Sequence, residues 1–291
     1  MSAPPMDSMP KIRTAFTRGL TATWSSPVVV IALLSWLLVE WVLIVALGFP
    51  GPASVLAHLS APPLLSTETD LRITIGLFGY GGLIVIFVVA AVHALWMSIV
   101  TGFAIEGIES GQVSRWGAIR GLRAFPVVFA LRVVGLLVWY AAQILIGVGG
   151  LGIALLVYVG ILVAFVWLTA FAPVIAVAEG RGWRDAFGRS YRAARLPGSG
   201  NLSFAAIYVL PVFTTLVSPS VPGSLLDVNP PFTAWAFIVL LNLLHIAVLA
   251  AFAMRYLAIA DEVPDAPSRA TPARGSRAGE RSSAKSRSRG R

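Results

Sequence analysis

Long apolar runs constrain this chain more than any other feature of its sequence. A helix that crosses a bilayer needs about 20 mostly apolar residues. Six runs are long enough to be predicted as spans, at 27–49, 73–103, 125–148, 150–177, 201–217 and 232–260. The run 201–217 is the weakest, because it is short and contains Pro211. Only 12% of the residues are charged, against about a quarter in soluble domains. We therefore predict an all-α membrane protein with six transmembrane helices.

The distribution of basic residues predicts how these spans are oriented. If odd-numbered spans run outward, one side of the membrane holds segments 1–26, 104–124, 178–200 and 261–291, and these carry nearly all of the Lys and Arg residues. The connections on the other side carry only Arg72, at a span boundary. Basic residues concentrate in cytoplasmic loops. We therefore predict a multi-pass protein of the cell membrane with both termini in the cytoplasm.

The same pattern divides the chain into three parts. Residues 1–26 form a cytoplasmic segment with an amphipathic helix, residues 27–260 the transmembrane domain, and residues 261–291 a basic cytoplasmic tail. The first apolar run is longer than the apolar core of a signal peptide, about 7–15 residues, so we expect it to be retained. The tail is poor in apolar residues and is predicted to be disordered. It is interpreted as a solvated segment or as a contact for anionic lipid, and no specific nucleic acid is predicted as a partner.

Three ten-residue stretches repeat one basic pattern. These stretches, called basic segments 1, 2 and 3, are RTAFTRGLTA (Arg13–Ala22), RWGAIRGLRA (Arg115–Ala124) and RDAFGRSYRA (Arg184–Ala193). With the first Arg counted as position 0 and about 100° per residue, positions 0, 5 and 8 form a basic face, and small or apolar residues fill the rest of the helix. This pattern predicts helices that lie flat in the cytoplasmic interface. The candidate headgroup contacts in segment 3 are Arg184, Arg189 and Arg192.

Each basic segment is followed by a proline, at Pro27, Pro126 and Pro197. Because proline disfavours helical geometry in the residue before it, these prolines predict where a surface helix ends and the next span begins. Two explanations of the pattern stay open. The chain contains three repeats of one surface helix and two spans, or the segments converged because cytoplasmic loops favour Arg, since only three of the ten positions agree in all copies.

Segment 3 lies within a longer motif, FAPVIAVAEGRGWRDAFGRSYRAARLPG, at 171–198. The motif joins a span with a late proline, a Glu-Gly pair and a helix with an Arg-Ser pair and a following basic residue. It resembles a motif in a broad group of bacterial and archaeal multi-pass proteins of unknown function, related to the membrane domain of glycerophosphoryl diester phosphodiesterases. The matching residues are Pro173, Glu179, Gly180, Arg189, Ser190 and Arg195. The resemblance implies a membrane domain without the catalytic barrel, which needs about 250 residues.

Polar residues inside the predicted spans are candidates for a functional site. Glu40 lies about 20 Å into the first span at about 1.5 Å per residue, which is past the midplane. Asn242 reaches a similar depth, with His245 one turn closer to the cytoplasm. The three residues form a candidate polar site or proton relay, or they are interhelical hydrogen-bond partners. His93 and Arg132 lie nearer the cytoplasmic edge, and Arg132 is expected to extend toward the headgroups.

The chain offers no recognisable catalytic constellation. It contains no cysteine, its three histidines are scattered, and it has no His-Glu-x-x-His or Gly-x-Ser-x-Gly motif. We therefore predict no catalytic residue, metal or cofactor. The favoured interpretation is a non-enzymatic protein that organises membrane components or binds anionic headgroups or an unidentified membrane protein. One alternative is a small-solute or ion transporter that uses Glu40, and the least favoured is a membrane-embedded enzyme.

Overall fold

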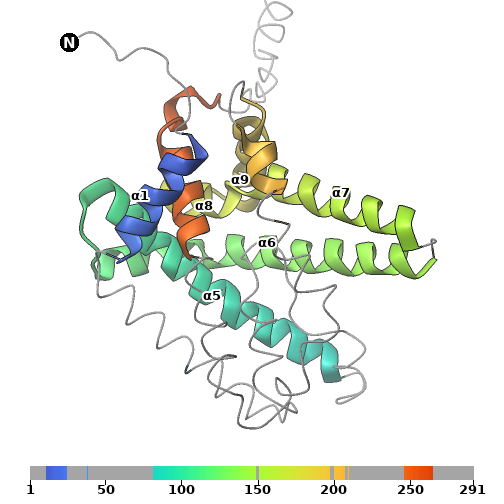
Figure 1. Ribbon diagram of the computed structural model, residues 1–291. Helices are drawn as coiled ribbons and strands as arrows, with labels where there is room; N and C mark the ends of the chain where they lie inside the picture. The colour runs from blue at the N-terminus through green and yellow to red at the C-terminus, as the bar shows by residue number, and fades with distance from the viewer. Residues whose placement is uncertain are drawn as a thin grey trace, which may run out of the picture.

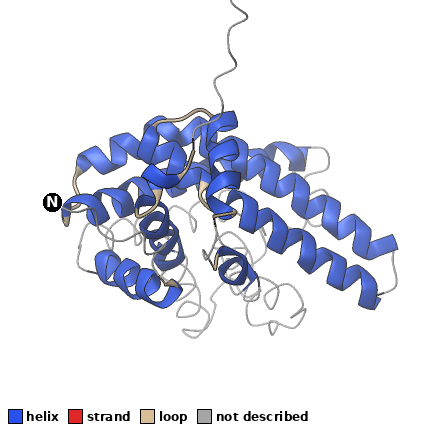
Figure 2. Cartoon of the chain, turned by 90° about the horizontal axis from the view of Figure 1, so that it is seen from above, coloured by secondary structure: helices blue, strands red, loops and turns tan. Residues whose placement is uncertain are grey.

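The computed structural model describes residues 11–24, 38, 81–148, 151–196, 200–206, 209 and 246–264. This part of the chain is helical and contains no strand (Figure 2). In chain order its elements are α1 (Ile12–Trp24), α5 (Gly81–Ser110), α6 (Arg115–Val148), α7 (Leu151–Thr169), α8 (Ala172–Glu179), α9 (Trp183–Ala194), the Ile246–Leu257 helix and the short 3-10 helix Ala260–Glu262 (Figure 1). The predicted all-helical class is confirmed for these residues.

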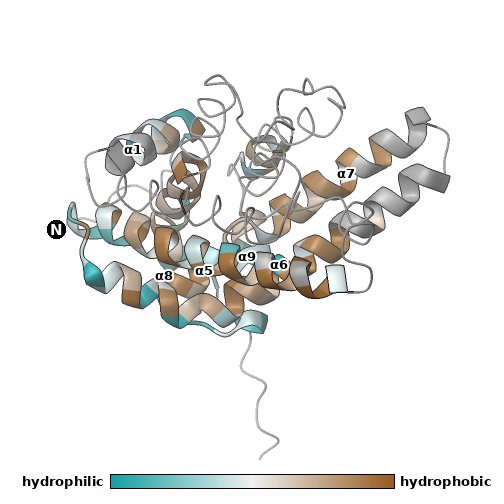
Figure 3. Cartoon of the chain, turned by 90° about the horizontal axis from the view of Figure 1, so that it is seen from below, coloured by the Kyte–Doolittle hydropathy of each residue, from teal (hydrophilic) through white to brown (hydrophobic). Residues whose placement is uncertain are grey.

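Three stretches are long and apolar enough to cross a membrane: Gly81–Ser110, Arg115–Val138 and Val159–Glu179. They correspond to the predicted spans 73–103, 125–148 and 150–177. The hydrophilic residues gather on the side of α1, α9 and the α5–α6 connection, whereas the coloured parts of α7 are mostly hydrophobic (Figure 3). The membrane class is thus supported. The predicted span 27–49 lies almost wholly outside the described residues and 201–217 largely so, whereas the second half of 232–260 is described and contains the Ile246–Leu257 helix.

The second and third of these stretches lie in a helical hairpin. Helices α6 and α7 contact each other and run side by side (Figure 1). The connection between them contains the glycine-rich stretch predicted to form a tight turn, of which only Gly147 and Val148 are described. Helix α5 packs against α6 over a longer stretch, and the two are joined by residues 111–114.

The two prolines in the apolar stretches have opposite effects on their helices. Pro173 lies in the first turn of α8, and α7 ends at Thr169. A proline ring clashes with the carbonyl four residues earlier, here that of Thr169, so the predicted span 150–177 is divided into two helices. By contrast, α6 is continuous through Pro126. The prediction that Pro126 separates a surface helix from a span is therefore wrong, and segment 2 is the first part of a long helix.

Close packing explains why α6 continues through Pro126. The backbones of α5 and α6 approach so closely that a Cβ atom on Gly102 or Gly121 would overlap the backbone of the other helix. These contacts hold the first turns of α6 in line with the rest of the helix. Pro126 itself is exposed, and so is Leu122, whose carbonyl loses its usual hydrogen bond. The unpaired carbonyl can therefore be solvated.

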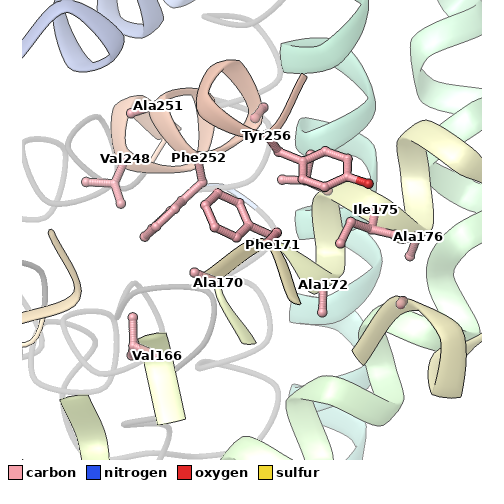
Figure 4. Close-up of a cluster of buried hydrophobic side chains, with 14 of the residues drawn as sticks. Val166, Ala170, Phe171, Ala172, Ile175, Ala176, Val248, Ala251, Phe252 and Tyr256 are labelled. Carbon is pink, nitrogen blue, oxygen red and sulfur yellow. The ribbon is translucent and has the colours of Figure 1, made fainter. Parts of the chain in front are cut away.

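The main core lies where α8 meets the Ile246–Leu257 helix. Residues 172–177 of α8 are all buried, so this short helix is buried on every side. Phe171, just before α8, packs edge-to-face on Phe252, with ring centroids 5.8 Å apart (Figure 4). Helices that are apolar all round belong inside a fold. These two helices form the centre against which α1, α6 and α9 pack.

Candidate functional site

A network of charged side chains lies where α8 ends. Glu179 is the last residue of α8, and Gly180 follows it with φ 64°, a left-handed conformation that favours glycine. The Glu179 carboxylate accepts hydrogen bonds from Arg181 Nε at 2.5 Å, from Arg189 Nε at 3.1 Å and from the Tyr256 hydroxyl. Helix α9 positions Arg189, and the Ile246–Leu257 helix positions Tyr256. The network therefore joins three helices.

Arg189 is the centre of this network. Its Nε also donates to the Tyr256 hydroxyl at 2.7 Å, and its two terminal nitrogens donate to the carbonyls of Val263 at 2.9 Å and Ala260 at 2.6 Å. Burial lowers the pKa of Arg189, but its hydrogen bond to Tyr256 and the charge of Glu179 outweigh this effect and raise the pKa above its usual value. The guanidinium is charged and engaged on all three nitrogens, so the arrangement is suited to holding helices together.

Arg120 in segment 2 makes a similar set of contacts. It donates from Nε to the Val177 carbonyl at 3.0 Å and from Nη2 to the Ala178 carbonyl at 2.6 Å. Its third nitrogen pairs with Glu109 at 2.7 Å. The last carbonyls of a helix have no partner within the helix. Arg120 therefore caps α8 from the neighbouring α6.

Glu106 caps the start of α6 in a complementary way. Its carboxylate accepts the backbone N–H of Ser114 at 2.8 Å and of Gly117 at 3.0 Å, and the Ser114 hydroxyl at 2.6 Å. A carboxylate at the start of a helix also interacts favourably with the helix dipole. The connection 111–114 is thus held by acidic and basic groups from both of the helices that it joins.

Three other arginines, in or just after the basic segments, lie on the outer surface beside aromatic rings. The guanidinium of Arg115 lies 5.3 Å from the centre of the Trp116 ring, and Arg184 lies 5.1 Å from that of Trp183. Trp116 is 61% exposed and Trp183 52% exposed. Further along α9, Arg195 lies 5.1 Å from the Tyr191 ring and donates to its hydroxyl at 2.6 Å. Exposed Trp and Tyr beside Arg are typical of the headgroup region of a membrane.

The predicted basic face of segment 3 requires one correction. The sequence predicts that Arg189 contacts headgroups, but its side chain is only 8% exposed. The buried residues of α9 are Ala186, Arg189, Ser190, Ala193 and Ala194. Position 5 of the segment borders this small-residue face, and Glu179 and Tyr256 draw its side chain inward. Arg184 is exposed, and Arg192 donates to the Pro264 carbonyl at 2.7 Å. Headgroup contact by these two stays a prediction.

The structure brings most of the family-like motif together around α8 and α9. Pro173 begins α8, Glu179 and Gly180 end it, and Glu179 bonds to Arg189. Ser190 donates from its hydroxyl to the Leu168 carbonyl at 2.7 Å, which attaches α9 to α7. Arg195 follows α9 and is exposed, away from the Glu179 network.

The candidate intramembrane site lies outside the described residues, since Glu40, Asn242 and His245 are not among them. The transporter interpretation therefore stays a prediction. His93 and Arg132 are described and buried, with Arg132 Nη2 2.6 Å from His93 Nδ1. The expectation that Arg132 extends toward the headgroups is wrong, because its side chain is turned into the α5–α6 interface. Within the described residues, no group of His, Asp and Glu side chains could hold a metal ion.

Sequence reasoning missed Arg120 and Tyr256. Arg120 had a signal, because it stands at the same position of segment 2 as Arg189 in segment 3. Tyr256 had none, since it lies in an apolar run 77 residues from Glu179. No known protein family, curated protein sequence or solved structure matches this chain.

Proposed function

We propose that this chain is a multi-pass protein of the cell membrane that binds anionic lipid headgroups through the outer faces of its basic segments. Its role is to organise membrane components rather than to catalyse a reaction. The six spans and the cytoplasmic location of both termini belong to this proposal, and they are supported by the distribution of Lys and Arg along the chain.

One observation carries the lipid proposal. In the basic segments, Arg120 and Arg189 form an inner set bonded to carboxylates and carbonyls, whereas three arginines in or just after the segments form an outer set beside exposed aromatic rings. The outer set has Arg115, Arg184 and Arg195, with Trp116, Trp183 and Tyr191. A guanidinium binds phosphate in a bidentate way, and a Trp ring is favourable at headgroup depth. The outer faces therefore combine the two chemistries that an anionic phospholipid surface requires.

The resemblance to the membrane domain of glycerophosphoryl diester phosphodiesterases is part of the same proposal. Its motif residues occupy places that shape the fold: Pro173 divides a span, Gly180 turns the chain, and Glu179 pairs with Arg189. We therefore infer that the motif residues stabilise the fold of a membrane domain. The resemblance supplies no catalytic residue, so it favours the non-enzymatic interpretation.

The experiment titrates lipid into the delipidated full chain in detergent and counts bound lipids by native mass spectrometry. The variant combines Arg115→Gln, Arg184→Gln and Arg195→Gln. Each basic residue near an anionic surface contributes about 1 kcal/mol, so the variant should bind phosphatidylglycerol up to about 100-fold more weakly. Binding of phosphatidylcholine should change little.

The matched control removes the same charge from the tail, through Arg269→Gln, Arg274→Gln and Arg277→Gln. This control should keep most of the preference for phosphatidylglycerol. The proposal fails if the two triple variants lose affinity equally, because binding would then follow net charge alone. It also fails if the unmodified chain binds both lipids equally well.

A further inference from the structure

The three basic segments pack through the same two positions. Position 2 is Ala15, Gly117 or Ala186, and position 6 is Gly19, Gly121 or Ser190; all six residues are buried. A Cβ atom on Gly19 would lie 3.0 Å from the Ala251 backbone nitrogen. A Cβ atom on Gly121 would overlap the backbone of Ser98, and Ser190 bonds to the Leu168 carbonyl. Each segment therefore lies tightly against one other helix through its small residues.

The three contact points share one register in the sequence. Ser98, Leu168 and Ala251 each stand eleven residues before a glutamate, namely Glu109, Glu179 and Glu262. An alanine stands fifteen residues before each glutamate, at Ala94, Ala164 and Ala247. The three basic segments thus pack on residues that stand at the same distance in the sequence before a glutamate. Convergence toward basic loops explains arginines, but it does not explain a shared packing register.

Each segment also contacts a second helix, and for segments 2 and 3 this contact lies at a helix end. Segment 2 packs on α5, and its Arg120 binds the last carbonyls of α8. Segment 3 packs on α7, and its Arg189 binds the Ala260 and Val263 carbonyls. Segment 1, within α1, packs on the Ile246–Leu257 helix and contacts α5. In Figure 1 the blue α1 lies beside the orange-red C-terminal helix. The contacts run from one helix to the next and return to the first.

We propose that the three basic segments and these helix ends form one ring with threefold pseudosymmetry, and that α1 is the strap that closes it. Segment 2 follows its packing partner α5 after the short connection 111–114, and segment 3 is joined to its packing partner α7 through α8 and residues 180–182. By contrast, α1 stands more than 200 residues from Ala251. Arg18, at the position of Arg120 and Arg189, is exposed. The strap therefore has no short covalent connection to its packing partner, and it is the joint of the ring that opens first.

Opening would have a defined structural consequence. The residues that α1 covers, Ala250 and Ala251, belong to a small-residue face of the Ile246–Leu257 helix. Small residues allow helices in membrane proteins to approach closely. Release of α1 exposes this face, whereas the equivalent face of α5 stays covered by segment 2. The ring is thus asymmetric in its dynamics although its packing is repeated.

The absence of cysteine in the chain allows a direct test by thiol labelling of the full-length protein. Ala251→Cys and Ser98→Cys place thiols at equivalent points, both fully buried, under segments 1 and 2. Gln112→Cys, in the exposed α5–α6 connection, gives the rate of an open thiol. We expect Ala251→Cys to react with a water-soluble maleimide at least tenfold more slowly than Gln112→Cys and at least tenfold faster than Ser98→Cys.

Each other outcome overturns the proposal. If Ala251→Cys reacts as fast as Gln112→Cys, α1 does not cover this helix and the ring is open. If it reacts as slowly as Ser98→Cys, α1 is not a releasable strap. A second pair on the segments themselves, Ala15→Cys and Ala186→Cys, both at 0% exposure, decides the matter should Ala251→Cys fail to fold. Ala15→Cys should react at least tenfold faster than Ala186→Cys, and equal rates refute the strap. The test does not depend on lipid binding.

Discussion

Replacement of Arg189 by alanine tests whether the inner arginines hold the fold together. The change removes the Glu179 ion pair, the bond to the Tyr256 hydroxyl and the bonds to the Ala260 and Val263 carbonyls. Since these partners belong to α8 and to the segment 246–263, the loss detaches α9 from two neighbours at once. A structural role for Arg189 therefore predicts a large loss of stability.

The contacts that remain set the size of this loss. Breaking a buried ion pair by removing one partner costs about 3–5 kcal/mol. Glu179 keeps Arg181, at 2.5 Å, and the Tyr256 hydroxyl, so its carboxylate is not left alone. Ala260 is partly exposed, and its carbonyl can bond to water. We therefore expect the lower end of the range, about 3 kcal/mol. At about 2–4 °C per kcal/mol for a chain of this size, the midpoint of thermal unfolding falls by about 6–12 °C.

The assay heats the full chain in detergent and follows the fraction that stays monodisperse. Arg184→Ala is the matched control, because it removes an exposed arginine from the same helix and should shift the midpoint by no more than about 2 °C. Glu179→Ala combined with Arg189→Ala should lose less than the sum of the two single losses, by about 1–3 kcal/mol. Equal midpoints for Arg189→Ala and Arg184→Ala would refute the structural role of the network.

Two further predictions concern helix packing and topology. Gly121→Val forces a side chain into the Ser98 backbone and should destabilise the protein by about 3 kcal/mol or more. The control Gly160→Val should be tolerated, because a Cβ atom at this position of α7 would meet no other atom within 4 Å. The midpoints of thermal unfolding in detergent compare the two variants, and equal losses of stability contradict the packing argument. Gln112→Cys and Gly182→Cys should react with an impermeant maleimide only from the cytoplasmic side, and labelling of either in intact cells contradicts the predicted orientation.

The apolar runs predicted the helices better than they predicted the ends of those helices. The runs at 73–103, 125–148 and 150–177 correspond to α5, α6 and α7–α8, because length and hydropathy are properties of the sequence itself. Pro126 and Pro173 look alike in that sequence, since each lies within or beside an apolar run. Pro126 is accommodated within α6 because glycines on α5 and α6 allow these helices to pack closely, whereas Pro173 divides a helix at Thr169. Tertiary packing decides between these outcomes.

The candidate site shows the same limit. The helical wheel placed Arg189 with the outward arginines, whereas the structure places it on the buried face with Ala186, Ser190 and Ala193. Position 5 lies at the edge of the small-residue face, where a long side chain can turn either way. The choice depends on Tyr256 and on the carbonyls of Ala260 and Val263, which lie more than 65 residues away. A wheel contains no information about such distant partners.

Because only the outer arginines are proposed to bind lipid, the net charge of the chain alone does not predict its affinity for anionic lipid. Each inner arginine has an acidic partner ten or eleven residues earlier, as in Glu109–Arg120 and Glu179–Arg189. Two of the outer arginines stand next to Trp, in Arg115–Trp116 and Trp183–Arg184. The Glu179–Arg189 pair is largely buried and is screened by salt much less than an exposed charge, whereas the Glu109–Arg120 pair is exposed and contributes little to stability. Salt should therefore weaken the binding of anionic lipid while leaving the thermal midpoint of the lipid-free chain nearly unchanged, and a parallel fall of both would show that the two sets of arginines act as one.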